Sequence, residues 1–466
     1  MNAEYERLEA AASDVEHQMR ELGGAVKLDS ASVVAGFEKQ IADLGRKLAS
    51  MRLGMALVRS VDSLEMKKRE QEFVQALPKK YHSQGTRKKV LHLPGEVTVT
   101  LLVTYYHRVK TPKQDQQQRR GLYPMLLLLG IGGHYTPRMR SQMAKAAVLL
   151  GSYEEAAEML AEQGINVSVN QLRDVTAGMG RMLQKLTAQG SLTVAGNVSG
   201  RRIVVSLDGG RVRLRERCKG KTKKGGKRFS PNWREPRLFI IYAVDDEGRM
   251  ADDFPPVIDG TLGSCDQLFA MLQAYLQGLN LTEASRVLVV ADGAAWIWQR
   301  VPKLVKALGL NDDQVQQLID FWHAVEYLGK IAESKSLPGS SKSRWVKAQK
   351  KRLWRGEIGT VVEEIETLIG SRPTKSQKTW LNYFLTHGIK NRRMDYSKSH
   401  TRQMPIGSGA IESAVRRVIN LRVKSNAVYW LRDNAETIIR LRLWVKAGRA
   451  EELFQQTTCV TPKLAV

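Results

Sequence analysis

The sequence predicts a mixed α/β core that follows several helical segments, and three observations support this fold class. Two apolar, β-branched segments, 202–210 and 286–293, are typical of buried strands. Helix-compatible sequence lies between these segments and after the second one, which is the alternation expected of an α/β sheet. The chain before residue 199 instead places most of its apolar residues at helical spacing. With 466 residues, the chain has room for about three domains.

Composition and charge indicate the class of partner. Hydrophobic residues make up 42% and charged residues 26% of the chain, so a sizeable core can form. Lys and Arg number 73 against 47 Asp and Glu, and the resulting net charge of +26 indicates a polyanionic partner. The 3 cysteines exclude a four-cysteine zinc ribbon and a paired disulfide framework. No apolar run approaches the ~20 residues of a membrane span, and the first twenty residues are too acidic for a signal peptide, so we expect a cytoplasmic protein without a membrane partner.

The first 85 residues are expected to form a helical region. Helical apolar spacing recurs over three tracts, at 2–21, 33–56 and 61–77. A helical bundle or a dimerisation arm would explain this region, and direct DNA binding is the alternative. Residues 86–135 follow as a β-rich connector, because Val97–Tyr106 is β-branched and aromatic. Within this connector, Lys110–Arg120 is polar and Gln-rich, with no core residues.

A helix-turn-helix domain is predicted over 136–198. Thr136 and Pro137 begin a helix with a capping residue and a first-turn proline, and Ser152 begins a second helix with a capping box. Ser168 has the same capping pattern before a third helix, and a tight Gly-containing turn precedes it. Many three-helix units bind nothing, but the basic charge of the chain favours a DNA reader. The third helix would then present three polar side chains to DNA: Asn170, Gln171 and Arg173.

Two of the predicted strands end in the same Asp-Gly pair. Segment 202–210 ends at Asp208-Gly209-Gly210 and segment 286–293 ends at Asp292-Gly293, with a further strand predicted at 237–244. Functional sites in α/β sheets lie at strand ends, where these two carboxylates fall. Asp-Gly is also a common turn pair. Two carboxylates at equivalent ends of adjacent strands, however, repel each other unless a cation lies between them.

A third carboxylate follows a Gly-Ser turn near the C-terminus. The segment Pro405–Ser413 leads into a helix, and Glu412 lies in the first turn of that helix. An acidic residue in this position also complements the helix dipole, so a purely structural role is the ordinary alternative. Glu412 becomes a candidate for chemistry only in combination with the two strand-end aspartates.

Four motifs together resemble those of the DDE transposases of bacterial insertion sequences. Ser206–Gly209, Val290–Gly293 and Ile406–Ser413 are similar to the Asp, Asp and Glu motifs of that family. Asp320–His323 is similar to its (Cys/Asp)-x-x-His element, which lies between the second Asp and the Glu. The similarity is closest to the ISKra group and the wider Mutator-like branch, and it covers roughly Ser152–Lys446. Four motifs in the expected order are much more specific than any one of them.

The resemblance implies an RNase H-like catalytic core with a helical insertion. The core would span 199–331 and 405–450, with the insertion at 332–404 and a tail at 451–466. The sequence agrees, because 120 positions (412 minus 292) separate the second Asp from the Glu, and the sequence between them is helix-rich and basic. The tryptophans of this insertion would either stack on DNA bases or pack its own small core.

The resemblance also implies a chemistry and its partners. Asp208, Asp292 and Glu412 would hold two Mg²⁺ ions, with Mn²⁺ as a substitute, and Asp208 would bridge both. Water would attack first to free a 3′-OH at each transposon end, and that hydroxyl would then attack target DNA. His323 would orient a phosphate or the leaving group, or else pack as an ordinary core histidine, and Asp320 is equally well explained as a helix cap. The partners would be double-stranded DNA at the nucleoid and at least one further copy of the chain.

Dense positive charge follows the first strand-end aspartate. The tract 211–228 is a candidate DNA clamp, although a charged run is usually a solvated surface. Its candidate contacts are Arg211, Arg213, Lys221, Lys223, Lys224, Lys227 and Arg228. The C-terminal helices carry further candidates on the same reasoning: Arg416, Arg417, Arg422, Lys424, Arg432, Arg440 and Arg442.

Two rival functions use the same residues. An RNase H-like nuclease or resolvase would cut DNA without joining it, and a DNA-binding regulator derived from a transposase would not cut at all. Other chemistries find no support, because the sequence has no phosphate-binding Gly-x-x-x-x-Gly-Lys-Ser/Thr loop and no nucleophile elbow. Relatives often carry a zinc-ribbon-like set of cysteines before the helix-turn-helix, and residues 97–112 contain none, so no zinc is expected.

Overall fold

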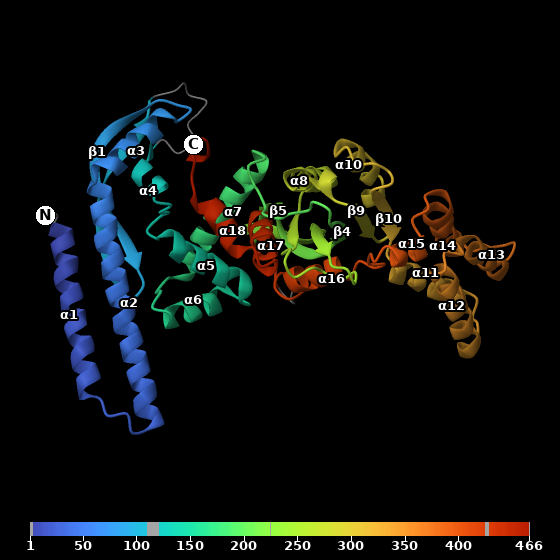
Figure 1. Cartoon of the computed structure of the whole chain (residues 1–466), viewed down its shortest axis with the longest axis horizontal. Helices are drawn as coiled ribbons and strands as arrows, with labels where there is room; N and C mark the ends of the chain where they lie inside the picture. Colours follow the sequence, from blue (N-terminus) through green and yellow to red (C-terminus); the bar gives the residue numbers. More distant parts are fainter. Residues whose placement is uncertain (1–2, 110–120, 224, 425–427, 466) are drawn as a thin grey trace. The chain divides into compact units, whose positions relative to one another are not determined.

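The computed structural model describes residues 3–109, 121–223, 225–424 and 428–465 (Figure 1). The chain divides into two compact units: residues 1–192 together with 451–466 form the first, and residues 193–450 form the second. The predicted polar connector 110–120 and the candidate contact Lys224 lie outside the described residues. No helix in the described ranges is long and apolar enough to cross a membrane.

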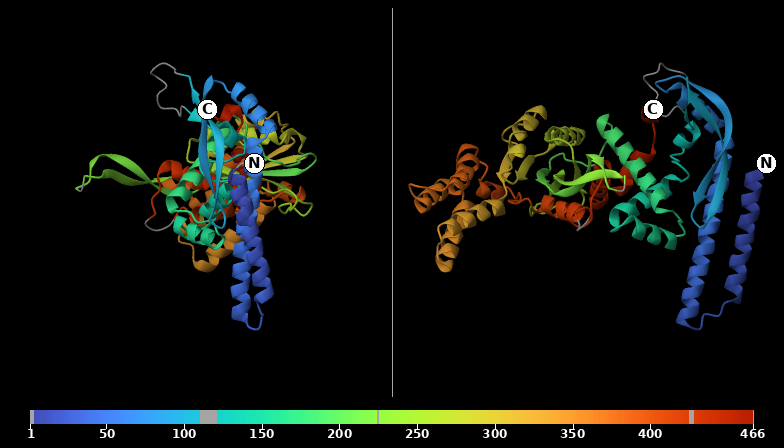
Figure 2. Two further views of the ribbon diagram at one scale, coloured as in Figure 1. Left: turned by 90° about the vertical axis from the view of Figure 1, so that its left-hand side faces the viewer. Right: turned by 180° about the vertical axis from the view of Figure 1, so that it is seen from behind.

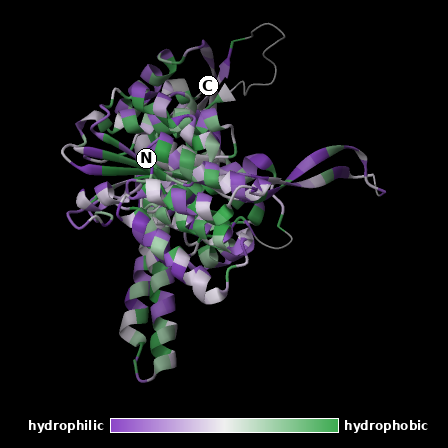
Figure 3. Ribbon diagram, turned by 90° about the vertical axis from the view of Figure 1, so that its right-hand side faces the viewer, coloured by the Kyte–Doolittle hydropathy of each residue, from purple (hydrophilic) through white to green (hydrophobic). Residues whose placement is uncertain are grey.

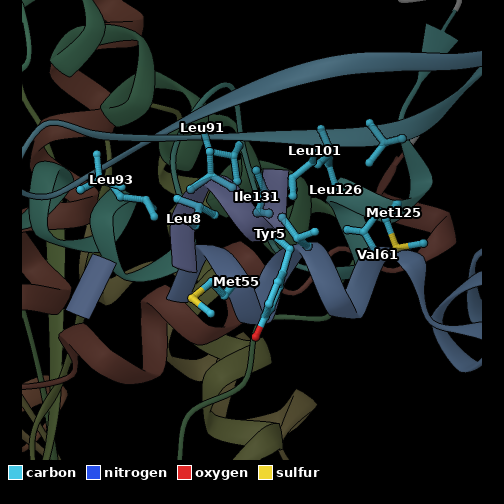
Figure 4. Close-up of a cluster of buried hydrophobic side chains, with 14 residues drawn as sticks. Tyr5, Leu8, Met55, Val61, Leu91, Leu93, Leu101, Met125, Leu126 and Ile131 are labelled. Atoms are coloured by element: carbon cyan, nitrogen blue, oxygen red, sulfur yellow. The ribbon is translucent and has the colours of Figure 1, made fainter. Parts of the chain in front are cut away.

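The N-terminal part of the first unit contains the three predicted helices. They are α1 (Ala3–Ala25), α2 (Ala31–Asp62) and α3 (Leu64–Gln75). The Oγ atoms of Ser30 and Ser63 accept hydrogen bonds from backbone N–H groups in the first turns of α2 and α3, which fixes where these helices begin. Helix α1 packs against α2, and a buried cluster that includes Leu8, Met55 and Leu101 joins both helices to a β-sheet (Figure 4).

That sheet consists of β1 (Tyr81–Leu93), β2 (Val97–Arg108) and the short β3 (Gly121–Leu122). Strand β2 was predicted, and it pairs antiparallel with both of its neighbours. Strand β1 was not predicted. It is polar and exposed over most of its length, and only Leu91 and Leu93 are fully buried, so it lacks the alternation that reveals a half-buried strand.

The three helices predicted between 136 and 198 are present as α5 (Pro137–Leu149), α6 (Tyr153–Glu162) and α7 (Val169–Ala188), after a short α4 (Pro124–Leu128). Met143, Leu160 and Leu172 are fully buried where α5, α6 and α7 meet. The segment expected as a tail contains α18 (Ala450–Thr458) and α19 (Pro462–Ala465). Leu453, Phe454 and Leu464 are buried, and residues 451–466 belong to the first unit.

A five-stranded mixed sheet forms the centre of the second unit. Its strands are β4 (Arg202–Gly209), β7 (Arg237–Val244), β8 (Val257–Thr261), β9 (Arg286–Ala291) and β10 (Val315–Ile319). The spatial order is β10-β9-β4-β7-β8. The pairs β4–β7 and β7–β8 are antiparallel, whereas β4–β9 and β9–β10 are parallel. Helices flank this sheet, so the predicted mixed α/β fold is present in the second unit.

Helices cover the sheet and extend from it. Helix α17 (Arg432–Lys446) packs against β8, α16 (Gly409–Val415) packs against β4 and β7, and α8 (Cys265–Gly278) packs against β7. The helix-compatible sequence that follows β9 forms two helices, α9 (Ala295–Trp298) and α10 (Val301–Ala307). Pro302 lies in the first turn of α10, where its missing N–H and its ring prevent a continuous helix.

The predicted helical insertion follows β10. It contains α11 (Phe321–Ser334), α12 (Gly339–Trp354), α13 (Ile358–Ile369), α14 (Lys375–Phe384), the π-helical turn η3 (Leu385–Lys390) and α15 (Tyr396–Thr401). These helices pack on one another through buried residues such as Leu353 and Ile365. Trp354 is 41% exposed, and its ring meets that of Phe321 in a T-shaped contact with 5.8 Å between the ring centres.

A buried ion pair joins β8 to α17. Nε and Nη2 of Arg440 donate to the two carboxylate oxygens of Asp259 at 3.0 and 2.6 Å, and the hydroxyl of Tyr275 donates to the second oxygen at 2.8 Å. Both charged side chains are almost completely buried. The pair is therefore structural, which corrects the expectation that Arg440 binds DNA.

We predict that removing one partner of this pair destabilises the second unit strongly. Asp259→Ala leaves the guanidinium of Arg440 buried and unpaired, so the free energy of unfolding should fall by about 3–5 kcal/mol. The control is Asp253→Ala, which breaks the more exposed pair of Asp253 with Arg201 and should cost less than about 1 kcal/mol. Denaturant unfolding of both variants measures the difference, and equal losses would contradict the assignment.

Candidate active site

The pairing of β4 with β9 brings the two strand-end aspartates together. The strands are parallel and Leu207 pairs with Ala291, so Asp208 and Asp292 follow at equivalent positions on neighbouring strands. Adjacent strands lie about 4.8 Å apart, and both carboxylates face the same edge of the sheet. Asp208 Oδ1 accepts a hydrogen bond from the N–H of Gly209 at 2.6 Å.

The turn after Asp292 is held by its side chain and by neighbouring aromatic rings. Asp292 Oδ1 accepts from the N–H of Ala294 at 2.9 Å, and the indole N–H of Trp298 donates to the Asp292 carbonyl at 2.5 Å. A Cβ atom at Gly293 would lie only 2.2 Å from Cε2 of Tyr383 on α14. The Asp-Gly pair is therefore required here by the close approach of Tyr383, in addition to its turn propensity.

Glu412 lies in the first turn of α16 and is held by a short chain of hydrogen bonds. Ser408 Oγ lies 3.0 Å from Glu412 Oε1 and 2.7 Å from Oδ2 of Asp320. The backbone N–H of Ser408 also donates to that Asp320 oxygen, and Asp320 Oδ1 accepts from the N–H of His323 at 2.9 Å. Asp320 is buried and caps α11, as the simpler interpretation of this residue predicted.

His323 lies between two carboxylates at the start of α11. Its Nε2 is 3.6 Å from Glu412 Oε1, and its Nδ1 is 3.7 Å from Glu326 Oε2. The side chain is about one-third exposed, so it is not a packed core histidine. A protonated His323 would interact favourably with both carboxylates, and a neutral one leaves a ring nitrogen free to accept a proton.

These side chains line one pocket with a volume of about 550 Å³. The pocket contains all four predicted catalytic residues: Asp208, Asp292, His323 and Glu412. Sequence reasoning missed three other residues that line it, Tyr242, Trp322 and Glu326. Trp322 lies inside the Asp-x-x-His motif and Glu326 follows one turn after His323, so helical spacing could have identified both.

The carboxylates in this pocket affect one another electrostatically. Burial, together with the negative charges of Asp292 and Glu412, raises the pKa of Asp208 from 3.8 to about 6. Within the described ranges, no three His, Cys, Asp or Glu side chains are close enough to hold one metal ion. The donor set nevertheless consists of carboxylate oxygens that repel each other across a pocket, which suits hard cations such as Mg²⁺.

The predicted recognition residues are exposed in the first unit. Asn170, Gln171 and Arg173 lie in the first turns of α7, on its solvent side. The side chain of Gln171 already has a structural role. Its Oε1 accepts a hydrogen bond from the backbone N–H of Ser168 at 2.8 Å and completes the capping box of α7. The amide group of Gln171 therefore has fewer atoms available for DNA than the other two side chains have.

The basic tract after Asp208 forms a two-stranded antiparallel hairpin of β5 (Val212–Lys221) and β6 (Lys227–Arg234), and we call residues 211–234 the arm. The arm projects from the rest of the second unit and is largely hydrophilic (Figures 2 and 3). Most of its candidate DNA contacts that the structure describes are exposed: Arg211, Lys221, Lys223, Lys227 and Arg228. Arg213 is half-buried and stacks on aromatic rings.

The C-terminal arginines divide into two groups. Arg416 and Arg417 are exposed, as are Lys424 and Arg432. Arg422 and Arg442 are buried, and Nε of Arg442 donates to the carbonyl of Arg417 at 3.0 Å. The expectation that these two bind DNA is therefore wrong, because both side chains are buried inside the fold.

The fold and the pocket define an α/β protein with three carboxylates at one end of its sheet. No protein-family model and no curated protein matches the chain. One solved structure to which it is similar is the Drosophila P element transposase strand transfer complex, at 12% identity and a TM-score of 0.25. The match covers 73% of this chain and 82% of that chain. A likeness this distant does not assign the chain to a family.

We predict that Asp208 destabilises the metal-free protein at neutral pH. Because its pKa is raised, the carboxyl group of Asp208 binds its proton more tightly in the folded state than in the unfolded state. The stabilisation of the fold by this proton is therefore fully present below pH 3.8 and is lost as the pH rises through about 6. In EDTA, Asp208→Asn should increase the free energy of unfolding at neutral pH by about 2 kcal/mol.

This increase in the free energy of unfolding should become smaller as the pH falls toward 3.8, because Asp208 of the wild type is then neutral as well. Denaturant unfolding over a range of pH values measures it. Asp246→Asn is the control, because the Asp246 side chain is almost fully exposed and its neutralisation should leave the pH dependence unchanged. An Asp208→Asn variant no more stable than the wild type at neutral pH would contradict the raised pKa.

Proposed function

We propose that this chain is a DDE-type DNA transposase that cleaves transposon ends and joins them to target DNA. One observation carries the proposal. Three carboxylates that are far apart in the sequence, Asp208, Asp292 and Glu412, line the same pocket, and they occupy the positions that the family motifs predict. His323 of the fourth motif lines the pocket too.

Two further features support the finer parts of the proposal. The mixed five-stranded sheet, with helices on it and a helical insertion before Glu412, is compatible with an RNase H-like core. Helices α5, α6 and α7 are compatible with a helix-turn-helix, with α7 as the recognition helix. The resemblance to the Mutator-like branch and to the ISKra group rests on the sequence motifs.

Asp208, Asp292 and Glu412 would hold Mg²⁺, which when bound activates an attacking oxygen and stabilises the leaving oxygen of a phosphodiester. The chain itself supplies the positions of these ligands. The β4–β9 register fixes the two aspartates relative to each other, and Ser408 and Asp320 fix Glu412 relative to α11. Preorganised ligands of this kind keep a reacting phosphate aligned.

His323 is the residue best placed to move a proton. It lies beside Glu412, lines the pocket and is partly exposed, so it can reach an oxygen of a bound phosphate. The exposed cations of the arm, such as Arg211 and Lys221, would neutralise the DNA backbone that enters the pocket. In this arrangement the carboxylates provide the chemistry and the arm provides affinity.

A nuclease or resolvase without strand transfer is the second candidate, because it would use the same pocket. A strand-transfer assay separates the two functions. Pre-cleaved donor ends are mixed with a supercoiled plasmid in Mg²⁺, and joined products support the transposase. Cleavage of uncut donor DNA without any joined product would favour the nuclease.

We predict that Asp208→Asn, Asp292→Asn and Glu412→Gln each reduce DNA cleavage by at least about a hundredfold while DNA binding is retained. These changes remove a metal-binding charge but keep the shape of the side chain, so the contacts of the arm with DNA are untouched. Gel assays of cleavage and of binding in EDTA measure the two effects separately. Mg²⁺ should also raise the melting temperature of the wild type more than that of the variants.

Glu326→Gln is the matched control for these changes. Glu326 lines the same pocket but belongs to none of the three carboxylate motifs, so its neutralisation should leave most of the cleavage rate. A carboxylate variant that still cleaves near the wild-type rate in Mg²⁺ would remove that residue from the site. If all three did so, the proposed function would be wrong.

We predict that Asn170→Ala combined with Arg173→Ala weakens binding to transposon ends more than binding to random DNA. Both side chains are exposed in the first turns of α7, where base edges of a major groove are within reach. Each lost base contact should cost about 1–3 kcal/mol of discrimination. Gln171 is left unchanged because it completes the α7 capping box, and its loss would weaken the helix itself.

Competition binding with labelled terminal repeats and unlabelled random duplex measures this loss of discrimination. Glu158→Ala on α6 is the control, since Glu158 is exposed on the helix that precedes α7. If the double variant protects the terminal repeat from nuclease digestion as the wild type does, α7 is not the recognition helix.

A further inference from the structure

Two exposed aromatic rings flank an arginine at the base of the arm. Arg213 of β5 pairs with Trp233 of β6, and its guanidinium carbon lies 4.9 Å from the centre of the Trp233 ring. The same guanidinium lies 5.4 Å from the ring centre of Tyr429, and its Nη1 is 3.4 Å from the Tyr429 hydroxyl. We call Arg213, Trp233 and Tyr429 the stacking platform.

Two backbone hydrogen bonds hold Tyr429 beside the other two residues of the platform, although the rings are exposed. The N–H of Trp430 donates to the carbonyl of Arg213 at 3.1 Å, and the N–H of Arg215 donates to the carbonyl of Trp430 at 2.7 Å. These bonds add residue 430 to the free edge of β5 and so fix Tyr429 beside the arm. Yet Trp233 is 49% exposed and Tyr429 is 44% exposed, which leaves large ring faces open to solvent.

The charge around the platform selects the class of partner. Residues 211–234 contain eleven Lys and Arg residues and a single acid, Glu216. Glu216 is already neutralised, because its carboxylate accepts from Arg234 at 2.8 Å and from Asn232 at 2.6 Å. Exposed aromatic rings in a strongly positive field fit a polyanion that carries flat apolar groups, which describes a nucleic acid strand with unpaired bases.

Duplex DNA does not use such rings, because its bases are stacked on each other and their faces are inaccessible. A single strand offers every base face for stacking, and an arginine beside the ring adds a cation–π contribution. The platform and the pocket are also connected by only a short segment of the sequence. Arg213 is five positions after Asp208, so an extended chain separates them by at most about 18 Å.

We propose that the stacking platform binds unpaired bases of a single DNA strand next to the carboxylate pocket. This inference rests on the proposed function for its setting, where cleavage or strand separation would expose such a strand. The binding itself needs neither metal nor chemistry. Bases would stack on the open faces of Trp233 and Tyr429, and Arg213, which lies between the two rings, would contact a neighbouring phosphate.

Equilibrium binding of the full chain to three labelled probes in EDTA tests the proposal. The probes are oligothymidine, an abasic strand of the same length and charge, and a duplex of the same length. Wild-type protein should bind oligothymidine more tightly than the abasic strand. Trp233→Ala with Tyr429→Ala should weaken binding of oligothymidine by roughly ten- to a hundredfold and remove the preference over the abasic strand, with little change for the duplex.

Two further variants make the test specific. Trp233→Phe keeps a ring and should restore most of the oligothymidine affinity, which separates stacking from a folding defect. The double change Lys221→Ala and Lys227→Ala removes charge farther along the arm. It should therefore weaken the binding of all three probes. It should also flatten the dependence of log affinity on log salt by about 0.7 per lost charge on single strands and 0.9 on the duplex.

The proposal is overturned if the Trp233 and Tyr429 variant binds oligothymidine as the wild type does, or loses affinity equally for all three probes. It is also overturned if these changes instead alter the oligomeric state in analytical ultracentrifugation, because the platform would then be a protein interface. Asp208→Asn separates this proposal from the proposed function. That variant should keep the oligothymidine preference, and its cleavage activity reports on the pocket alone.

Discussion

Parallel pairing of β4 with β9 is the constraint on which the candidate site depends. Because Leu207 pairs with Ala291, the next residue of each strand is an aspartate at the same edge of the sheet. A shift of one residue would turn one of these carboxylates to the opposite face. The buried strands resist such a shift, since their apolar side chains are covered on both faces by helices. The sheet thus holds two carboxylates close together. Burial, to which the negative charges of Asp292 and Glu412 add, raises the pKa of Asp208.

The third carboxylate depends on a different kind of link. Asp320 follows β10 and is buried, yet it accepts hydrogen bonds both from the first turn of α11 and from Ser408, 88 positions away. Ser408 in turn contacts Glu412. The long helical insertion therefore begins and ends next to the same carboxylate, Asp320. A Cβ atom at Gly407 would lie 3.2 Å from Asp320 Oδ2, which explains the glycine in this turn.

Local patterns in the sequence predicted much of this arrangement, and the missing parts have a common cause. Strands β4, β7 and β9 are continuous apolar segments and were predicted, whereas β8 and β10 were not. Gln317 in β10 accepts from Nε of Arg393 at 2.9 Å, and Asp259 in β8 pairs with Arg440, 181 positions away. Polar residues interrupt both strands because distant side chains satisfy them inside the fold. The four candidate catalytic residues could be selected from the sequence because each lies in a short motif, while Tyr242 and Glu326 lie in none.

The net charge of +26 also has two different origins. Arg440 and Arg442 are buried against a carboxylate and a carbonyl, so they contribute to the fold and not to binding. In the arm, by contrast, the positive charge is exposed. A two-stranded ribbon is marginally stable by itself, and among the described residues the backbone of Trp430 adds a hydrogen-bonded neighbour to β5 at its base. The contacts that anchor the arm therefore also place Tyr429 beside Arg213 and Trp233. Their rings need no binding partner to be positioned, which is what a preorganised surface for flat bases requires.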